Sequence, residues 1–260
     1  MNLKGKQPIA IAGLVVLALF GAACDSNGTP SAEETVTPAT DASDLPQGSE
    51  HVELDPADFT TEIDNPYWPM AVGSRWVYRE TDAEGAEQRV EVTVTDKTKK
   101  IANGIEARVV HDEVTEDGVP VEVTDDWYAQ DAEGNIWYLG EATTEYENGK
   151  PVSTKGSFEA GKDGAEAGII MPADPKPGLQ YRQEYYEGEA EDRGEIVSLG
   201  EDVEVPFGKF NDALKTKDTN PLEPDLVEYK YYARGVGPML AETVSGGSDR
   251  EELISYTEGK

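Results

Sequence analysis

From about residue 59 onward, apolar and polar residues alternate with a period of two. Clear examples are residues 89–95, 119–124 and 195–199, which are also rich in β-branched side chains. Because successive side chains of a strand point to opposite faces of a sheet, this alternation predicts strands that are buried on one face. After residue 57 there is no long stretch with the 3.6-residue period of an amphipathic helix. We therefore expect an all-β domain over residues 58–260.

The connections between these segments have the composition of tight turns. Asn-Gly or Asp-Gly pairs occur at Asn103-Gly104, Asp117-Gly118 and Asn148-Gly149. Such pairs tolerate the positive φ angles of two-residue hairpin turns. The sequence therefore predicts antiparallel strands joined in order, as a meander.

A weak internal repeat suggests how the strands are grouped. Residues 73–76, 103–107 and 127–129 align with residues 178–181, 207–211 and 231–233, at offsets of 105, 104 and 104 residues. A period of this length indicates a duplicated supersecondary unit, because solenoid periods are shorter. We expect two tandem repeats, at about 66–156 and 171–256, that form a curved sheet, a half-barrel or a sandwich.

The N-terminus has the order of features found in secretory signals. Lys4 and Lys6 precede the uncharged apolar run 9–20, which is followed by small residues and then Cys24. The segment GAAC resembles a lipobox, and Cys24 is the only cysteine of the chain. We expect a signal peptide at 1–23 and a lipidated, palmitate-type anchor at Cys24, which places the protein at the extracytoplasmic face of a cell membrane. The alternative is an ordinary cleaved signal with an incidental cysteine.

Composition separates a linker from the domain and excludes some partners. Residues 24–57 are rich in Ser, Thr, Pro, Gly and acids, a composition that predicts a flexible tether. The formal net charge of the chain is −31. Nucleic acid is therefore not an expected partner, because phosphate contacts need cationic groups.

Three segments resemble a group of exported bacterial lipoproteins of unknown function with a β-rich domain. These segments are residues 65–78 (NPYWPMAVGSRWVY), 205–210 (VPFGKF) and 231–237 (YYARGVG). The resemblance implies a β architecture and an envelope location. It implies no reaction and no catalytic residue.

Motifs for catalysis are absent from the sequence. The two histidines are His51, in the expected tether, and His111, on the expected polar face of a strand, and no Gly-x-Ser-x-Gly elbow occurs. We expect a non-enzymatic protein with no catalytic residue and no cofactor other than calcium. The alternative is a hydrolase of envelope polymers that uses paired carboxylates.

One acidic cluster is a candidate calcium site. Calcium prefers six to eight oxygen ligands, and carboxylates supply them. A solvated acidic turn without an ion is the other interpretation. If calcium binds, the domain would be a calcium-dependent structural module. The candidate residues are Glu184, Glu187, Glu189, Glu191 and Asp192.

Four pairs of adjacent aromatic residues are the candidate ligand-binding residues. Neighbours on a strand point to opposite faces, so each pair places one ring on each side of the sheet. In one interpretation, both faces of the sheet are covered. In the other, some rings line a groove that binds an apolar or glycan ligand, and the expected partner is a lipid, a glycan or a protein of the envelope. The rings are those of Trp127, Tyr128, Trp137, Tyr138, Tyr185, Tyr186, Tyr231 and Tyr232.

Overall fold

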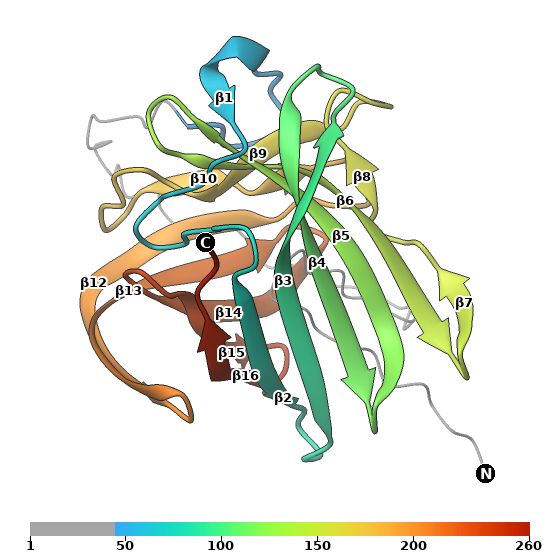
Figure 1. Ribbon diagram of the computed structural model, residues 1–260, viewed down its shortest axis with the longest axis vertical. Coiled ribbons are helices and arrows are strands. Elements are labelled where there is room, and N and C mark those ends of the chain that lie inside the picture. Colours follow the sequence, from blue (N-terminus) through green and yellow to red (C-terminus); the bar gives the residue numbers. More distant parts are fainter. Residues whose placement is uncertain (1–44) are drawn as a thin grey trace, which may run out of the picture.

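The computed structural model of the chain describes residues 45–260. The expected signal peptide, Cys24 and the tether up to residue 44 lie outside the described residues. Within 45–260 there is one short 3-10 turn, Pro56–Asp58, and otherwise only strands and loops (Figure 1). No helix in this part of the chain has the length and apolar character needed to cross a membrane. The strands are β1 (Phe59–Thr60), β2 (Arg75–Thr81), β3 (Glu87–Lys100), β4 (Glu106–Glu116), β5 (Val119–Asp131), β6 (Ile136–Glu147), β7 (Lys150–Ser153), β8 (Phe158–Glu159), β9 (Glu166–Met171), β10 (Gln180–Arg182), β11 (Glu184–Tyr185), β12 (Arg193–Val205), β13 (Gly208–Asn220), β14 (Glu223–Ala233), β15 (Gly237–Ser245) and β16 (Arg250–Thr257).

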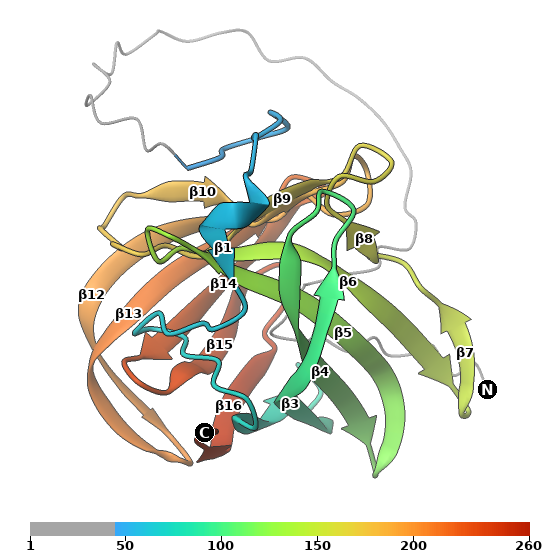
Figure 2. The ribbon, with the colours of Figure 1, turned by 45° about the horizontal axis from the view of Figure 1, so that its top comes forward.

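All strands pair antiparallel in one strongly curled sheet, which confirms the all-β prediction. The order is β10-β12-β13-β14-β15-β16-β2-β3-β4-β5-β6-β9-β11. Two meanders, β2 to β6 and β12 to β16, meet where β16 pairs with β2. The sheet curls until it is nearly closed and barrel-shaped (Figures 1 and 2). The tandem duplication stays a prediction.

The two ends of this order are formed by one stretch of chain, which we call the seam. β10 pairs with β12, whereas β11, which begins two residues after β10 ends, pairs with β9. Only Gln183 separates the two strands. The same segment therefore contributes to both edges of the sheet and brings them together.

The turn predictions agree with the backbone at two hairpins. Asp117 and Gly118 have φ of 51° and 77° between β4 and β5, and Asn148 and Gly149 have φ of 52° and 71° between β6 and β7. Positive φ at both positions is the conformation that Asp-Gly and Asn-Gly pairs favour.

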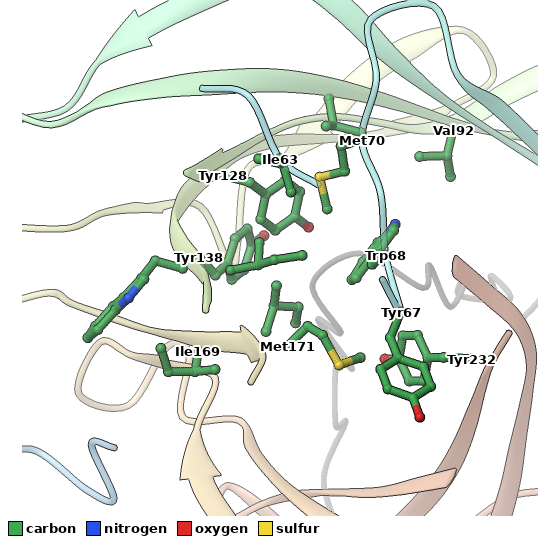
Figure 3. Packing of buried hydrophobic residues seen from close by; sticks show 14 of the residues in the cluster. Ile63, Tyr67, Trp68, Met70, Val92, Tyr128, Tyr138, Ile169, Met171 and Tyr232 are labelled. Carbon is green, nitrogen blue, oxygen red and sulfur yellow. The ribbon is translucent and has the colours of Figure 1, made fainter. Parts of the chain in front are cut away.

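Alternation along the strands separates an inner from an outer face. On β4, Val110, Asp112 and Val114 are buried, while His111 and Glu113 between them are partly exposed. The inner face carries most of the apolar core, and the segment before β2 adds Trp68 and Met70 to it. Figure 3 shows Trp68 between Tyr128 and Tyr232, at ring-centroid distances of 5.8 and 6.0 Å.

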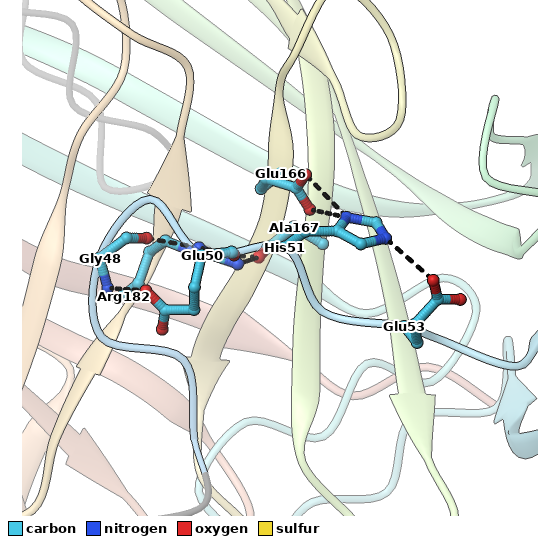
Figure 4. Close-up of polar contacts among 7 residues, drawn as sticks. All are labelled: Gly48, Glu50, His51, Glu53, Glu166, Ala167 and Arg182. Atoms are coloured by element: carbon cyan, nitrogen blue, oxygen red, sulfur yellow. Dashed lines mark hydrogen bonds and ion pairs between the residues drawn. The ribbon is translucent and has the colours of Figure 1, made fainter.

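Residues 45–51, which the composition assigns to the tether, lie across β9 and β10. The Arg182 guanidinium donates to the backbone oxygens of Gly48, Glu50 (2.8 Å) and Ala167 (2.7 Å) (Figure 4). His51 Nδ1 lies 2.9 Å from Glu166 Oε1. Specific contacts to the sheet therefore begin ahead of residue 58.

Candidate functional site

Buried charges in residues 45–260 are mostly acidic. A carboxylate moved out of water loses its hydration, so it needs a partner or a proton. The buried bases are Arg108, Arg182 and Lys230. The buried acids are Glu80, Asp112, Glu122, Asp126, Asp131, Glu141, Glu184, Asp192, Asp218, Glu228 and Glu251.

Strand register places three of these acids side by side on the inner face. Asp126 of β5 is opposite Glu141 of β6 and opposite Val110 of β4. Opposite residues of an antiparallel pair share a face, and so do residues two apart on one strand. Asp112 is therefore on the same face as Asp126 and Glu141. We call Asp112, Asp126 and Glu141 the inner acidic row.

Asp126 and Glu141 converge on one phenol. The Tyr138 hydroxyl lies 2.7 Å from Asp126 Oδ1 and 2.7 Å from Glu141 Oε2. A phenol has one hydrogen, so it donates to one carboxylate, and the second contact needs a proton on the other carboxyl. Burial raises the pKa of both acids, and their mutual repulsion adds to the pKa shift of Asp126. Both effects favour a pair that holds one proton near neutral pH.

Asp112 has a different environment. It is 1% exposed, and neither of its carboxylate oxygens has a hydrogen-bond partner among the described residues. Burial, with a smaller contribution from Glu141, raises the pKa of Asp112 to about 8. Glu251 of β16 is likewise buried with two unpartnered oxygens, and burial together with Glu80 and Asp112 raises its pKa.

A pocket of about 270 Å³ lies beside the seam and reaches Glu141. We call it the seam pocket. Three aromatic residues and three acids line it, together with one lysine. Lys99 Nζ lies 3.1 Å from Glu159, so that acid is already neutralised. The lining residues are Trp127, Glu141, Ala142, Ser157, Phe158, Glu159, Lys162, Asp163, Ala165 and Tyr186.

The structure places only two of the eight candidate aromatic residues, Trp127 and Tyr186, in the seam pocket. Tyr128, Tyr138 and Tyr232 are buried in the core.

The remaining three rings lie elsewhere. Trp137 is buried beside Phe59 and donates to Asp131 at 2.7 Å. Tyr185 is partly buried on β11, and Tyr231 is partly buried, with Lys215 Nζ 5.3 Å from its ring centroid. The eight rings therefore do not form one groove.

The five candidate calcium ligands also have different environments. Glu184 and Asp192 are buried, Glu187 and Glu189 are exposed, and Glu191 accepts a hydrogen bond from the Gly188 amide at 2.9 Å. Across residues 45–260, no three or more His, Cys, Asp or Glu side chains are grouped so that they could hold a metal ion. Calcium binding at this hairpin stays a prediction.

Sequence reasoning missed the inner acidic row, although a signal for it exists. Asp112 is in phase with Val110 and Val114. An acid at a position of the apolar phase indicates a charged group on the buried face. Asp126 has no such signal, because on β5 the apolar phase of the sequence is Val119, Val121 and Val123. The structure reverses the expected faces there and buries Glu122, Thr124 and Asp126 instead.

Comparisons with known proteins assign no family. No family model and no curated protein matches the chain. One solved structure, described as a "putative lipoprotein" from Parabacteroides distasonis, is similar with a TM-score of 0.41 and 13% identity. The alignment covers 74% of this chain and 99% of that chain. A likeness at this level establishes neither family nor function.

Proposed function

We propose that this protein is a lipid-anchored protein of the bacterial cell envelope whose β domain binds a small organic cation in the seam pocket without catalysing a reaction. The observation that carries the binding proposal is Glu141, a carboxyl on the wall of the seam pocket. Glu141 and its neighbour Asp126 are buried and contact one phenol. An ammonium group in the pocket, beside Glu141, would offset the negative charge of this pair.

The walls of the seam pocket support a cationic ligand. Trp127, Phe158 and Tyr186 offer ring surfaces, which attract cations through their quadrupole and also pack against methylene groups. The volume of about 270 Å³ is slightly below the usual range of ligand pockets, so it suits a small molecule. In place of the apolar or glycan ligand expected from the sequence, we propose an amine with an apolar body.

Binding can be measured by calorimetry on the detergent-solubilised full-length chain. Butylamine is expected to bind, and butanol, which has the same length and no charge, to bind at least about tenfold more weakly. Glu141→Gln should weaken butylamine by about 10- to 100-fold, because a hydrogen bond to a charged group contributes about 1.5–3 kcal/mol.

Glu113→Gln is the matched control, because Glu113 is on the outer face of β4. Equal affinities for butylamine and butanol, or an unchanged affinity in Glu141→Gln, would contradict the proposal.

The geometry does not favour the hydrolase alternative. Glycosidases hold a substrate bond between their two carboxyl groups. Here the Tyr138 hydroxyl fills the space between Asp126 and Glu141, and the two acids are 0% and 2% exposed. A polymer has no access between them in this arrangement.

The envelope anchor rests on Cys24 and is tested separately. Cys24→Ser is expected to move the protein from the membrane fraction to the soluble fraction and to abolish labelling with radioactive palmitate. The physical reason is that the acyl chains hold the protein at the membrane through burial of their methylene groups. Retention of the variant in carbonate-washed membranes would refute the anchor and leave the binding proposal intact.

A further inference from the structure

Lys230 of β14 is a buried amine that contacts two buried acids. Its Nζ lies 2.9 Å from Asp218 of β13 and 3.3 Å from Glu228 of β14, and the three side chains are 6%, 9% and 7% exposed. Asp218 and Glu228 are opposite each other in the strand register, and Lys230 is two residues from Glu228, so all three are on the inner face. An amine and a carboxyl in such contact either stay an ion pair or condense to an amide.

Burial favours the reactive form of this pair. Two ions taken out of water lose hydration that their mutual attraction repays only in part. Moving one proton from the Lys230 ammonium to the Asp218 carboxylate gives a neutral amine beside a neutral carboxyl. The neutral amine has the lone pair that attacks a carbonyl carbon, whereas the ammonium has none. Because the fold holds the two groups together, the reaction is intramolecular, and well-oriented intramolecular reactions reach effective molarities of about 10⁵–10⁸ M.

The Asp218 carboxyl has a hydrogen-bond donor at each oxygen. Thr216 Oγ1 donates to Oδ1 at 3.0 Å, and Gln183 Nε2 donates to Oδ2 at 3.2 Å. Such donors stabilise the negative charge that develops on oxygen when the carbon is attacked. Gln183 is the residue between β10 and β11, so this donor reaches Asp218 when the seam closes. The carboxyl is therefore activated in the folded chain.

Glu228 is placed to move the protons of a condensation. Its Oε2 lies 3.3 Å from Lys230 Nζ, and its side chain is opposite Asp218. Burial raises the pKa of Glu228, so it holds a proton more readily than an exposed glutamate does. A carboxyl in this position can take a proton from the attacking nitrogen and give one to the departing oxygen, which is general acid–base catalysis.

A small cavity beside the three side chains has room for the water that a condensation releases. It has a volume of about 10 Å³, and Lys230, Asp218, Glu228 and Asp192 are among the residues that line it. This volume is close to that of one water probe. Asp192 is buried, and its Oδ1 has no partner among the described residues, so it can accept a hydrogen bond from this water.

We propose that Lys230 and Asp218 form an intramolecular isopeptide bond, with Glu228 as the catalytic acid and base. The Nζ lone pair attacks Cγ of Asp218, so that the Cγ–Nζ bond forms and the Cγ–Oδ2 bond breaks. Glu228 takes one proton from the nitrogen and gives one to the departing oxygen, which leaves as water. The step involves no oxidation or reduction. The product is a neutral amide, which removes both charges from the interior and joins β13 to β14 covalently.

Mass spectrometry of the denatured, trypsin-digested full-length chain tests the bond. An unmodified chain is cleaved after Lys217 and after Lys230. An amide on Lys230 Nζ blocks the second cleavage, because trypsin needs the free ammonium. We therefore expect a peptide of residues 218–234 whose mass is lower than that of its sequence by one water molecule. Fragmentation should place the missing water within 218–230.

Three variants separate the reaction from a structural ion pair. Lys230→Arg keeps the positive charge without the primary amine and should give uncross-linked peptides of full mass. Glu228→Gln should leave most of the purified chain uncross-linked, because general acid–base catalysis contributes about 10²–10⁴-fold to a rate. Lys215→Arg is the matched control and should cross-link like the wild type, since Lys215 is also on β13 but lies over the Tyr229 ring. Circular dichroism checks that each variant is folded.

Two results would overturn the proposal. Complete cleavage after Lys230 in the wild type, even after prolonged incubation of the folded protein, would show that Lys230 and Asp218 stay an ion pair. A missing water that persists in Lys230→Arg would belong to another position, such as a cyclic imide at Asp117-Gly118. Neither result affects the proposed function, because none of the three residues lines the seam pocket.

Discussion

Replacing Asp112 by asparagine is expected to raise the melting temperature of the ligand-free protein at pH 9 and to flatten its dependence on pH. Burial holds the pKa of Asp112 at about 8, against 3.8 for an ordinary aspartate. Between these two values the folded protein binds a proton that the unfolded chain releases. The free energy of unfolding therefore decreases as pH rises from about 4 to about 8.

The size of the effect follows from the pKa shift. Each pKa unit corresponds to about 1.4 kcal/mol, so ionising Asp112 in the folded protein costs up to about 6 kcal/mol above pH 8. Asparagine avoids this cost. It leaves a buried amide without hydrogen-bond partners, which lowers the free energy of unfolding by about 1–3 kcal/mol. The net gain at pH 9 is about 3 kcal/mol or more, which is roughly 6–12 °C for a domain of this size.

Thermal melts of the full-length chain at pH 5 and pH 9 measure this gain. At pH 5 the wild-type carboxyl is protonated, so Asp112→Asn should have no advantage there. Glu113→Gln is the control, because Glu113 is next to Asp112 in the chain and its carboxyl is on the outer face of β4. Wild type and Asp112→Asn with parallel melting temperatures across this range would show that Asp112 is not buried as a neutral acid.

Gly168→Ala is expected to destabilise the fold by at least about 3 kcal/mol, or to prevent folding. Gly168 is on β9 opposite the seam, and a Cβ there would lie 2.3 Å from the carbonyl carbon and oxygen of Gln183. These are backbone atoms between β10 and β11, so no side-chain rotation can relieve the overlap. The two edges of the sheet would have to separate, which would open the core next to them.

Urea denaturation and hydrogen exchange report on this change. Beyond a lower denaturation midpoint, the amides of β9 and β11 should lose protection first, because their pairing closes the sheet. Gly208→Ala is the matched control, since Gly208 is also on a strand with ordinary φ and its nearest neighbour atom is 3.8 Å away. An equal midpoint for Gly168→Ala and Gly208→Ala would mean that β9 and the seam are not in close contact.

Local sequence patterns predicted the strands, but they did not predict the seam pocket or the inner acidic row. The alternation predicted strands at 89–95 and 119–124, and both lie within observed strands. The pairing of Trp127 and Tyr186 in one pocket had no local signal, because these residues are far apart in sequence and on different strands or loops. The inner acidic row had a local signal at Asp112, but its meaning depended on what lies opposite.

The sequence by itself determined that this chain forms antiparallel strands with tight turns, because side-chain alternation and turn chemistry act between residues close together in the chain. Only the tertiary structure decided that the sheet curls until β10 and β11 meet at Gln183. That closure turns one face of every strand into an interior. In an open sheet, acids such as Asp112 would be in contact with water. In the closed sheet they are buried, so each carboxylate needs a cation or a proton.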